Sequence, residues 1–357
     1  MEQLILAINP GSTSTKFGVY EVDKVVFSAT IRHSVGEISR FTRISEQFSF
    51  RKELIINELD KRNIPIKKIR AIVGRGGLLK PIESGIYEVN NLMKKDLQAG
   101  KRGEHASNLG GLIAADIAKD IPGSSAFIVD PVVVDEMHDV ARLSGHPLLE
   151  RISIFHALNQ KAVARAYAES LNIEYEDLNL IVAHMGGGIS VGAHIKGRVV
   201  DVNNAFNGDG PFSPERSGTL PAGQLVELCF SGKYTEQEVM KMITGRGGMV
   251  AYLDTNNFKE ICEKADAGDE KAKLVKEASA YQVAKDIAAC AAVMKGQVDA
   301  IILTGGLAHD ESHTDYIRQM VEFIAEVVIY PGEDELQALA HSGLLAINNK
   351  ITIKEYK

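Results

Sequence analysis

Three short segments rich in glycine and hydroxyl groups each follow an apolar run, and each is suited to binding phosphate. Residues 9–16 read Asn-Pro-Gly-Ser-Thr-Ser-Thr-Lys, residues 184–188 read His-Met-Gly-Gly-Gly, and residues 304–307 read Thr-Gly-Gly-Leu. Glycine lets backbone N–H groups approach anionic oxygens, hydroxyl groups donate hydrogen bonds, and lysine neutralises charge. Together the three segments predict a nucleotide site.

The first segment is not a P-loop. It lacks the GxxxxGK[ST] spacing and leads into a predicted strand, whereas a P-loop leads into a helix. Taken singly, residues 9–16 and 184–188 could each be an ordinary polar hairpin or a tight turn. That alternative is weaker for the pair, because both segments follow the first strand of a repeated unit.

Four charged or titratable residues lie at strand ends, in a loop or at a helix start, where catalytic residues are commonly found. Arg75 is flanked by glycines at the end of an apolar run, and Arg216 lies in a loop that contains proline and glycine. Asp130 directly follows the apolar run 126–129, and His156 opens a predicted helix. Guanidinium groups bind carboxylates and phosphates, and a carboxylate at a strand end can hold a metal ion. An ordinary salt bridge, turn or helix cap is the competing interpretation for each.

The elements that must position these residues occur twice along the chain. Each half has a predicted strand, a glycine-rich turn and two further strands: 4–8, 17–20 and 25–31 in the first half, and 180–183, 190–195 and 198–202 in the second. Further strands are predicted at 71–73, 126–129, 300–303 and 327–330, and helices at 51–62, 104–119, 155–170, 271–294 and 335–347. Repeats of this length are duplicated domains.

We therefore predict an α/β chain in which two duplicated domains face a nucleotide cleft. Residues 1–150 form the first domain and residues 151–334 the second. Residues 335–357 form a C-terminal helix and tail that pack near the domain junction. No low-complexity linker marks the boundary.

Composition excludes several other classes of protein. The chain has 357 residues, and its 40 basic and 47 acidic side chains give a net charge of −7, so a nucleic-acid partner is not expected. Hydrophobic residues at 45% and charged residues at 24% are typical of a globular protein. Three dispersed cysteines suggest neither a disulfide framework nor a zinc site. With neither a signal-peptide pattern nor a membrane-spanning run, we expect a cytoplasmic protein without a membrane partner.

Taken in order, the motifs resemble the acetate kinase family of the actin-like ATPase superfamily. The resemblance runs through essentially the whole chain and rests on residues 9–17, 74–77, 129–131, 155–157, 184–188, 216–218 and 304–307. It implies two ribonuclease-H-like domains, a homodimer held by the second domain, and ATP with Mg²⁺ as cofactors. The implied reaction is reversible phosphorylation of a small-molecule carboxylic acid to an acyl phosphate.

The resemblance also implies a role for individual residues. The implied nucleotide-binding residues are Asn9, Ser12, Ser14 and Lys16 in a first phosphate loop, His184, Gly186, Gly187 and Gly188 in a second, and Gly305, Gly306 and Leu307 at the adenosine. Arg75 and Arg216 would bracket the transferred phosphoryl group. Asp130 is similar to a catalytic aspartate associated with Mg²⁺, and His156 to a histidine that contacts the γ-phosphate in the transition state.

Two segments either match the family pattern in more than one register or depart from it. The family has an acidic residue after its last strand, and Glu333, Asp334 and Glu335 are all candidates for it. After Arg75, acetate enzymes carry bulkier aliphatic residues, whereas this chain has Gly76 and Gly77. We expect these glycines to border the acid and to leave room for one larger than acetate.

Other functions remain open at this point. A sugar kinase of the same fold would need the aspartate as a base and a polar pocket, and the paired arginines favour a carboxylate acceptor instead. A non-catalytic actin-like ATP-binding or filament module would bind nucleotide without turnover that depends on an acid. Within the family, acetate, propionate and branched-chain acids compete as substrates.

Overall fold

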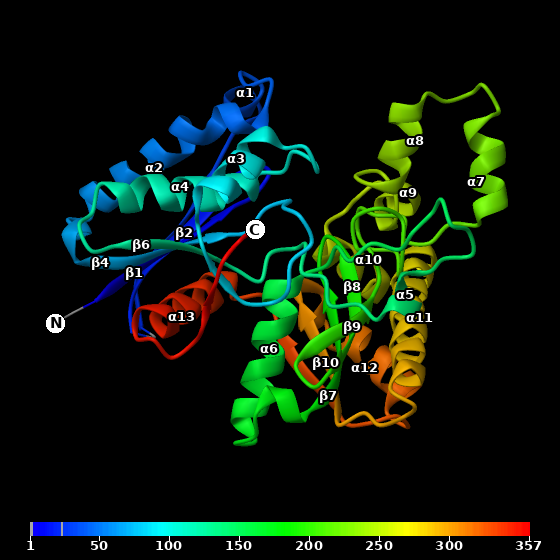
Figure 1. Ribbon diagram of the computed structural model, residues 1–357. Helices are drawn as coiled ribbons and strands as arrows, with labels where there is room; N and C mark the ends of the chain where they lie inside the picture. Colours follow the sequence, from blue (N-terminus) through cyan, green and yellow to red (C-terminus); the bar gives the residue numbers. More distant parts are fainter. Residues whose placement is uncertain (1–2, 23) are drawn as a thin grey trace. The chain divides into compact units, whose positions relative to one another are not determined.

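The computed structural model describes residues 3–22 and 24–357 and divides into two compact α/β units. The first unit contains the chain up to Val134 together with Asp334–Lys357, and the second contains Asp135–Glu333. Figure 1 shows the helices and strands of both units, with labels where there is room. None of the described helices is long and apolar enough to cross a membrane.

The first unit is built on a mixed sheet in the order β12-β5-β6-β4-β1-β2-β3. Its strands are β1 (Leu4–Pro10), β2 (Ser14–Glu21), β3 (Lys24–Arg32), β4 (Ile69–Arg75), β5 (Ile86–Glu88), β6 (Ser125–Val129) and β12 (Ile353–Lys354). β1, β2 and β3 form an antiparallel meander, while β4 runs parallel to β1 and β6 runs parallel to β4. The C-terminal ends of β1, β4 and β6 therefore lie at one edge of the sheet.

Helices cover both faces of this sheet (Figure 1). They are α1 (Val35–Ile38), η1 (Ile44–Gln47), α2 (Phe48–Lys61), η2 (Ile66–Lys68), α3 (Asn91–Ala99), α4 (Asn108–Lys119) and α13 (Glu335–Ile347). α4 packs on β4 and β6, and α13 packs on β1 and β4 from the opposite face. Burial of β1 on both faces explains why residues 4–8 are continuously apolar.

The second unit repeats the same strand pattern. Its sheet has the order β11-β10-β7-β8-β9, with β7 (Asn179–Met185), β8 (Ile189–Ile195), β9 (Arg198–Val202), β10 (Ala300–Gly305) and β11 (Val327–Pro331). β7, β8 and β9 form an antiparallel meander, and β10 and β11 extend the sheet in parallel with β7. The predicted duplication is confirmed, since the order and directions of β7, β8, β9, β10 and β11 repeat those of β1, β2, β3, β4 and β6.

The second unit also buries its sheet on both faces. Its helices are α5 (Asp139–Arg142), α6 (Ala157–Ser170), η3 (Tyr175–Asp177), α7 (Ala222–Cys229), α8 (Glu236–Ile243), α9 (Met249–Leu253), α10 (Phe258–Asp266), α11 (Glu270–Val293), η4 (Gly306–His309) and α12 (Glu311–Val321). Ile181 and Ala183 join the core cluster beneath α11, whereas Leu180 and Val182 face the cluster beneath α6. Because successive side chains of β7 point to opposite faces of the sheet, this one strand contributes residues to both cores.

The units divide at a different point from the one expected from sequence. Residues 135–150 lie in the second unit, because Glu136 accepts hydrogen bonds from Lys161 Nζ at 2.7 Å and from the N–H of Val199 at 2.9 Å. The C-terminal residues 335–357 belong to the first unit and do not stand apart, because α13 packs on its sheet. No change in composition marks either point.

Candidate active site

In the first unit, three of the predicted residues come from adjacent parallel strands. Asn9 lies near the end of β1, Arg75 is the last residue of β4, and Asp130 directly follows β6. The strand register pairs Ile8 with Gly74 and Arg75 with Val129. Asn9, Arg75 and Asp130 are therefore brought together at one edge of the sheet, where open α/β sheets bind ligands.

Glu335 joins this group from the far end of the chain. Its carboxylate accepts a hydrogen bond from Asn9 Nδ2 and pairs with Arg75 Nη1 at 3.0 Å. Arg75 Nη1 also lies 3.4 Å from Asn9 Oδ1. The Glu335 side chain is only 7% exposed, whereas that of Arg75 is 21% exposed. The Arg75 side chain thus stays partly exposed next to a buried counter-charge.

The other two acidic candidates have different surroundings. Asp334 caps α13 by accepting a hydrogen bond from the N–H of Gln337 at 3.0 Å. Glu333 lies in the second unit, where a carboxylate oxygen is 3.8 Å from His184 Nε2. Of the three acids, Glu335 is the one that contacts Asn9 of the predicted first phosphate loop and Arg75.

The predicted first phosphate loop is held by a residue that sequence reasoning missed. The loop turns through a hydrogen bond from Gly11 N–H to Ser14 O at 2.8 Å, and Lys16 is exposed beside Asn9 in the hairpin register. Arg51 of α2 is fully buried and donates from Nη1 to Gly11 O at 2.8 Å and to Ser14 O at 2.9 Å. Burial lowers the pKa of Arg51 to about 10, so it stays charged at neutral pH. Nothing in the sequence of this helix distinguishes Arg51 from a surface arginine.

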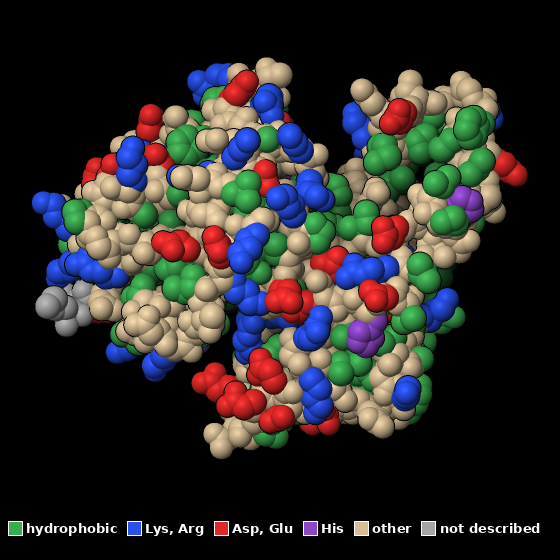
Figure 2. Space-filling view, in the orientation of Figure 1, with side chains coloured by type: hydrophobic (Ala, Val, Ile, Leu, Met, Phe, Trp, Pro, Cys, Tyr) green, Lys and Arg blue, Asp and Glu red, His purple; other side chains and the backbone are tan. Residues whose placement is uncertain are grey.

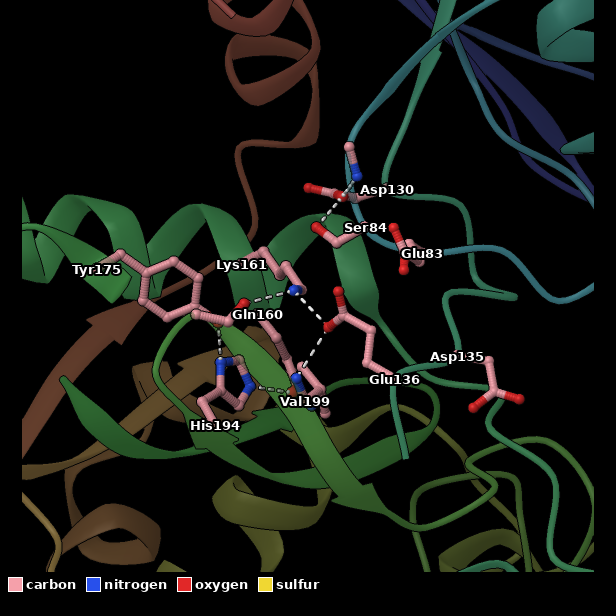
Figure 3. Close-up of polar contacts among 12 residues, drawn as sticks. Glu83, Ser84, Asp130, Asp135, Glu136, Gln160, Lys161, Tyr175, His194 and Val199 are labelled. Atoms are coloured by element: carbon pink, nitrogen blue, oxygen red, sulfur yellow. Dashed lines mark hydrogen bonds and ion pairs between the residues drawn. The ribbon is translucent and has the colours of Figure 1, made fainter. Parts of the chain in front are cut away.

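Asp130 has a constrained backbone and an anchored carboxylate. Its φ is +35°, in a region that costs a non-glycine residue roughly 1–3 kcal/mol and that is often found at functional sites. Oδ1 accepts hydrogen bonds from the Ser84 hydroxyl at 2.6 Å and from the Gly85 N–H at 2.7 Å (Figure 3). The side chain is therefore held at the strand end in one orientation.

Asp130 is compatible with Mg²⁺ but does not form a closed metal cage. Among the described residues, no group of three or more histidine, cysteine, aspartate or glutamate side chains is arranged to hold a metal ion. Mg²⁺ in phosphoryl-transfer enzymes is commonly bound by one or two carboxylates, with waters and substrate phosphates as the other ligands. A single anchored carboxylate fits that mode.

Gly76 and Gly77 do not open a space for the acid in the way expected from sequence. A Cβ at Gly76 would overlap the side chain of Pro131 and touch Ile128, and a Cβ at Gly77 would overlap Asn108. Neither direction is empty. The argument that missing side chains here enlarge the acyl pocket is therefore wrong, because the glycines are required by close packing against the chain itself.

In the second unit, two histidine rings stack on one another. His184 is the buried penultimate residue of β7, and His156 occupies the N-cap position of α6. Their ring centroids are 3.9 Å apart and their planes differ by 14°. His184 Nδ1 lies 2.7 Å from Asn159 Oδ1, and His156 Nδ1 lies 2.9 Å from Ser190 Oγ. Two imidazolium ions at this separation would repel, so the pair favours at most one positive charge.

Arg216 lies against Gly188 of the predicted second phosphate loop. A Cβ at Gly188 would overlap Nη1 of Arg216, so only glycine permits this approach. Arg216 Nη1 donates to Ala205 O at 2.6 Å, and Ser213 Oγ donates to Gly187 O at 2.6 Å. The structure thus brings the predicted residues Arg216, Gly187 and Gly188 together within one unit.

The predicted adenosine segment is only partly available. Gly306 is exposed and has open space where a Cβ would stand, but the side chain of Leu307 is buried in the core beneath α11. The segment leads through η4 into α12, which borders a cavity of about 270 Å³. Lys276, Ser312, His313 and Tyr316 are among its lining residues.

This cavity contains charged groups that the sequence motifs do not predict. Lys276 Nζ pairs with Asp310 at 2.8 Å, next to the cavity. Burial opposes ionisation of Asp310, but hydrogen bonds from Lys276 and Ser312 outweigh it and lower its pKa to about 2. His313 is 1% exposed, and burial lowers its pKa to about 4, so its imidazole is neutral at pH 7.

Comparison with known proteins finds a family match and two full-length relatives. Residues 147–340 match the model of the acetokinase family. The chain is 58% identical to butyrate kinase 2 of Clostridium acetobutylicum over 357 residues, which is 100% of both chains. It is 57% identical to butyrate kinase 1 of the same organism over 353 residues, 99% of each.

A solved structure supports the fold independently. The crystal structure of Porphyromonas gingivalis acetate kinase matches with a TM-score of 0.81 at 19% identity, covering 97% of this chain and 100% of the other. At this identity the likeness establishes that the chain shares the fold of this acetate kinase. The predicted fold class is confirmed.

Proposed function

This chain belongs to the acetokinase family, and we propose that it transfers the γ-phosphoryl group of ATP to butyrate or a similar short-chain fatty acid. The products are the acyl phosphate and ADP, and the reaction is reversible. The observation that carries the proposal is 58% identity along the full length of a relative named butyrate kinase. Arg75 and Arg216, two residues suited to binding anionic groups, support it.

The acceptor requires no catalytic base. A short fatty acid has a pKa near the ~4.3 of a glutamate side chain, so it is already an anion at neutral pH. The difficulty is to bring this anion onto a phosphoryl group whose oxygens are negative and gain charge during transfer. Positive groups and hydrogen-bond donors meet that need, which is why arginines and an imidazole N–H suit the reaction.

We propose that Arg75, Arg216 and His156 stabilise the negative charge that develops on the transferred phosphoryl group. Each well-placed donor is worth roughly 3–4 kcal/mol in the transition state, or about 10²–10³ in rate. Glu335 holds the guanidinium of Arg75 through one nitrogen, and Gly188 allows Arg216 to lie against the second phosphate loop. Both arginines are thus positioned before substrate arrives.

ATP and Mg²⁺ are assigned to the predicted loops. The phosphate chain is bound by Asn9, Ser12, Ser14 and Lys16 and by His184, Gly186, Gly187 and Gly188. The nucleoside lies by Gly305 and Gly306 and extends toward the cavity bordered by Lys276 and His313. Asp130 would hold Mg²⁺, which neutralises charge on the phosphoryl oxygens when bound.

The preferred acid is longer than acetate. Each methylene that becomes buried is worth ~0.8 kcal/mol, so the two additional methylenes of butyrate give ~1.6 kcal/mol, or roughly tenfold in kcat/KM over acetate. Because the space beside Gly76 and Gly77 is filled by the chain itself, this preference must come from other residues. Propionate, acetate and branched-chain acids are the alternative substrates.

A homodimer and a cytoplasmic location complete the proposal. None of the residues of α7 is buried, and Val226 and Phe230 are 56% and 87% exposed. Figure 2 shows hydrophobic side chains gathered over α7 and α8. Exposed apolar patches of this kind mark association sites, so we assign this face of the second unit to the dimer contact. The three free cysteines are compatible with a reducing compartment.

Hydroxamate trapping tests the proposed reaction. The purified protein is incubated with magnesium ATP and hydroxylamine together with acetate, propionate, butyrate, isobutyrate or glucose. Acyl hydroxamate should form fastest with butyrate or a close analogue, and ADP release should depend on the acid. ADP release with glucose alone would indicate a sugar kinase, and nucleotide binding without turnover would indicate a non-catalytic module.

A further inference from the structure

A buried series of polar side chains extends from His156 into the second unit. Ser190 of β8 contacts His156, Gln160 of α6 contacts Ser190, and His194 of β8 contacts Gln160 and Tyr175. Ser190, Gln160 and His194 are fully buried, and Tyr175 is 4% exposed. Polar groups this deep need defined donors and acceptors, so the hydrogen positions can be worked out.

The orientation of Gln160 follows from a backbone group. Gln160 Nε2 lies 2.9 Å from the carbonyl oxygen of Ser190, which can only accept. The amide nitrogen must therefore face Ser190, and Oε1 faces His194 Nε2 at 3.0 Å. Because Oε1 can only accept, His194 carries its proton on Nε2.

The far end of the series agrees with this assignment. Burial, followed by the positive charges of Lys161 and Arg165, lowers the pKa of His194 well below its ordinary value, so the ring is neutral. Its Nδ1 is then an acceptor, and it receives the hydroxyl hydrogen of Tyr175 at 2.7 Å. Figure 3 shows the His194 ring between Tyr175 and Gln160.

At the His156 end of the series, the hydrogen bonds determine where the hydroxyl hydrogen of Ser190 points. Its Oγ accepts a hydrogen bond from Gln160 Nε2 at 2.8 Å and is approached by the backbone N–H of His156 at 3.4 Å. A hydroxyl oxygen has two acceptor positions and one hydrogen. With both acceptor positions engaged, the Ser190 hydrogen points to Nδ1 of His156, 2.9 Å away.

We propose that Ser190, oriented by Gln160, is a positioning residue that keeps Nδ1 of His156 as an acceptor and places the proton on Nε2. The ring then presents a neutral N–H donor of fixed direction, which suits a phosphoryl oxygen that gains negative charge. This inference rests on the proposed function for the role of that donor. The tautomer itself follows from the hydrogen bonds alone.

Nitrogen NMR of the full-length enzyme labelled with ¹⁵N-histidine tests the inference directly. Long-range proton–nitrogen spectra distinguish an N–H nitrogen from an imine nitrogen, and loss of signals in His156→Gln assigns the residue. In the unaltered protein, Nε2 of His156 should carry the proton and Nδ1 should be an imine nitrogen that accepts a hydrogen bond. A proton on Nδ1 would overturn the proposal, even in an enzyme that makes acyl phosphate normally.

A pair of variants separates positioning from packing. In Ser190→Ala, the Nδ1 signal should move toward that of an imine nitrogen without a hydrogen bond. The kcat should fall about tenfold, the effect of one neutral hydrogen bond, with KM for ATP within about twofold. Ser190→Thr keeps the hydroxyl and should restore both the Nδ1 signal of His156 and the kcat. An unchanged Nδ1 signal in Ser190→Ala, or no restoration by threonine in a folded protein, would contradict the proposal.

Discussion

Arg75 and Glu335 are 260 residues apart in the chain and form an ion pair at 3.0 Å within the first unit. The carboxylate is nearly buried, and it also accepts a hydrogen bond from Asn9. One acid from the start of α13 therefore fixes both Asn9, a predicted phosphate-loop residue, and a predicted catalytic arginine. A buried charge with two partners leaves an uncompensated partner when it is removed.

Glu335→Gln should lower kcat by about two orders of magnitude, because an oriented guanidinium is worth about as much as one oxyanion donor. Arg75 is 21% exposed, so solvent screens the charge left behind, and the thermal midpoint should fall less than in Arg75→Ala, which leaves a carboxylate only 7% exposed without its cation. Glu333→Gln, which alters a more exposed acid, should have a smaller effect. Equal losses in the two variants would contradict the assignment of Glu335.

Arg216→Ala and Arg75→Ala should each lower kcat by about two to three orders of magnitude while nucleotide affinity stays within a few-fold, because both act on charge that develops during transfer. Arg75 should also contribute to stability. Arg75→Ala leaves Glu335 without its cation and should lower the thermal midpoint more than Arg75→Lys does. Steady-state kinetics with nucleotide titration checks the first expectation, and near-normal kcat in Arg216→Ala would remove that residue from the mechanism.

Gly76→Val should reduce activity on acetate and butyrate by the same factor and lower the thermal midpoint. The added side chain would collide with Pro131 and would not fill a substrate pocket. Overpacking of this kind costs about 1–3 kcal/mol. Gly36→Ala is the control, since its Cβ would meet nothing within 4 Å. A selective shift of Gly76→Val toward acetate would restore the pocket hypothesis.

The stability of the second unit should depend on His313. Its folded pKa of about 4 lies below the unfolded value of ~6.5, so the unfolded chain binds the proton more readily. The contribution of the neutral His313 ring to the free energy of unfolding is full above pH ~6.5 and is lost as the pH falls toward 4. The loss between pH 7 and pH 5 amounts to about 2 kcal/mol. The fall in melting temperature between these pH values should be smaller in His313→Phe than in the native protein. The exposed His146→Gln should behave like the native protein, and equal falls in all three would contradict the prediction.

The fold was predictable because the signals are local. Residues 4–8 and 180–183 are apolar and end in glycine-rich turns, and those patterns recur at the same point of each unit. The predicted 335–347 helix has the same bounds as α13. Hydrophobic periodicity and turn residues act over a few positions, so a single sequence records them.

Most of the site residues lie at strand ends and could be named, but their partners could not. Arg51 is buried beneath the first loop, and nothing in its helix distinguishes it from a surface residue. The choice of Glu335 over its two acidic neighbours depends on how α13 packs on β1 and β4. The error at Gly76 has the same cause, because the space beside a glycine is filled by a residue more than fifty positions away, Pro131.

Phosphorus NMR of the purified protein with magnesium ATP and butyrate tests the proposed reaction most directly. If the protein is a carboxylate kinase, ATP signals should fall while ADP and a new acyl phosphate signal rise together, and adding excess ADP should reverse the change. The new signal should be absent without the acid and in Arg216→Ala over the same time. Release of inorganic phosphate without an acyl phosphate, or no change in ATP with any short fatty acid, would contradict the proposed function.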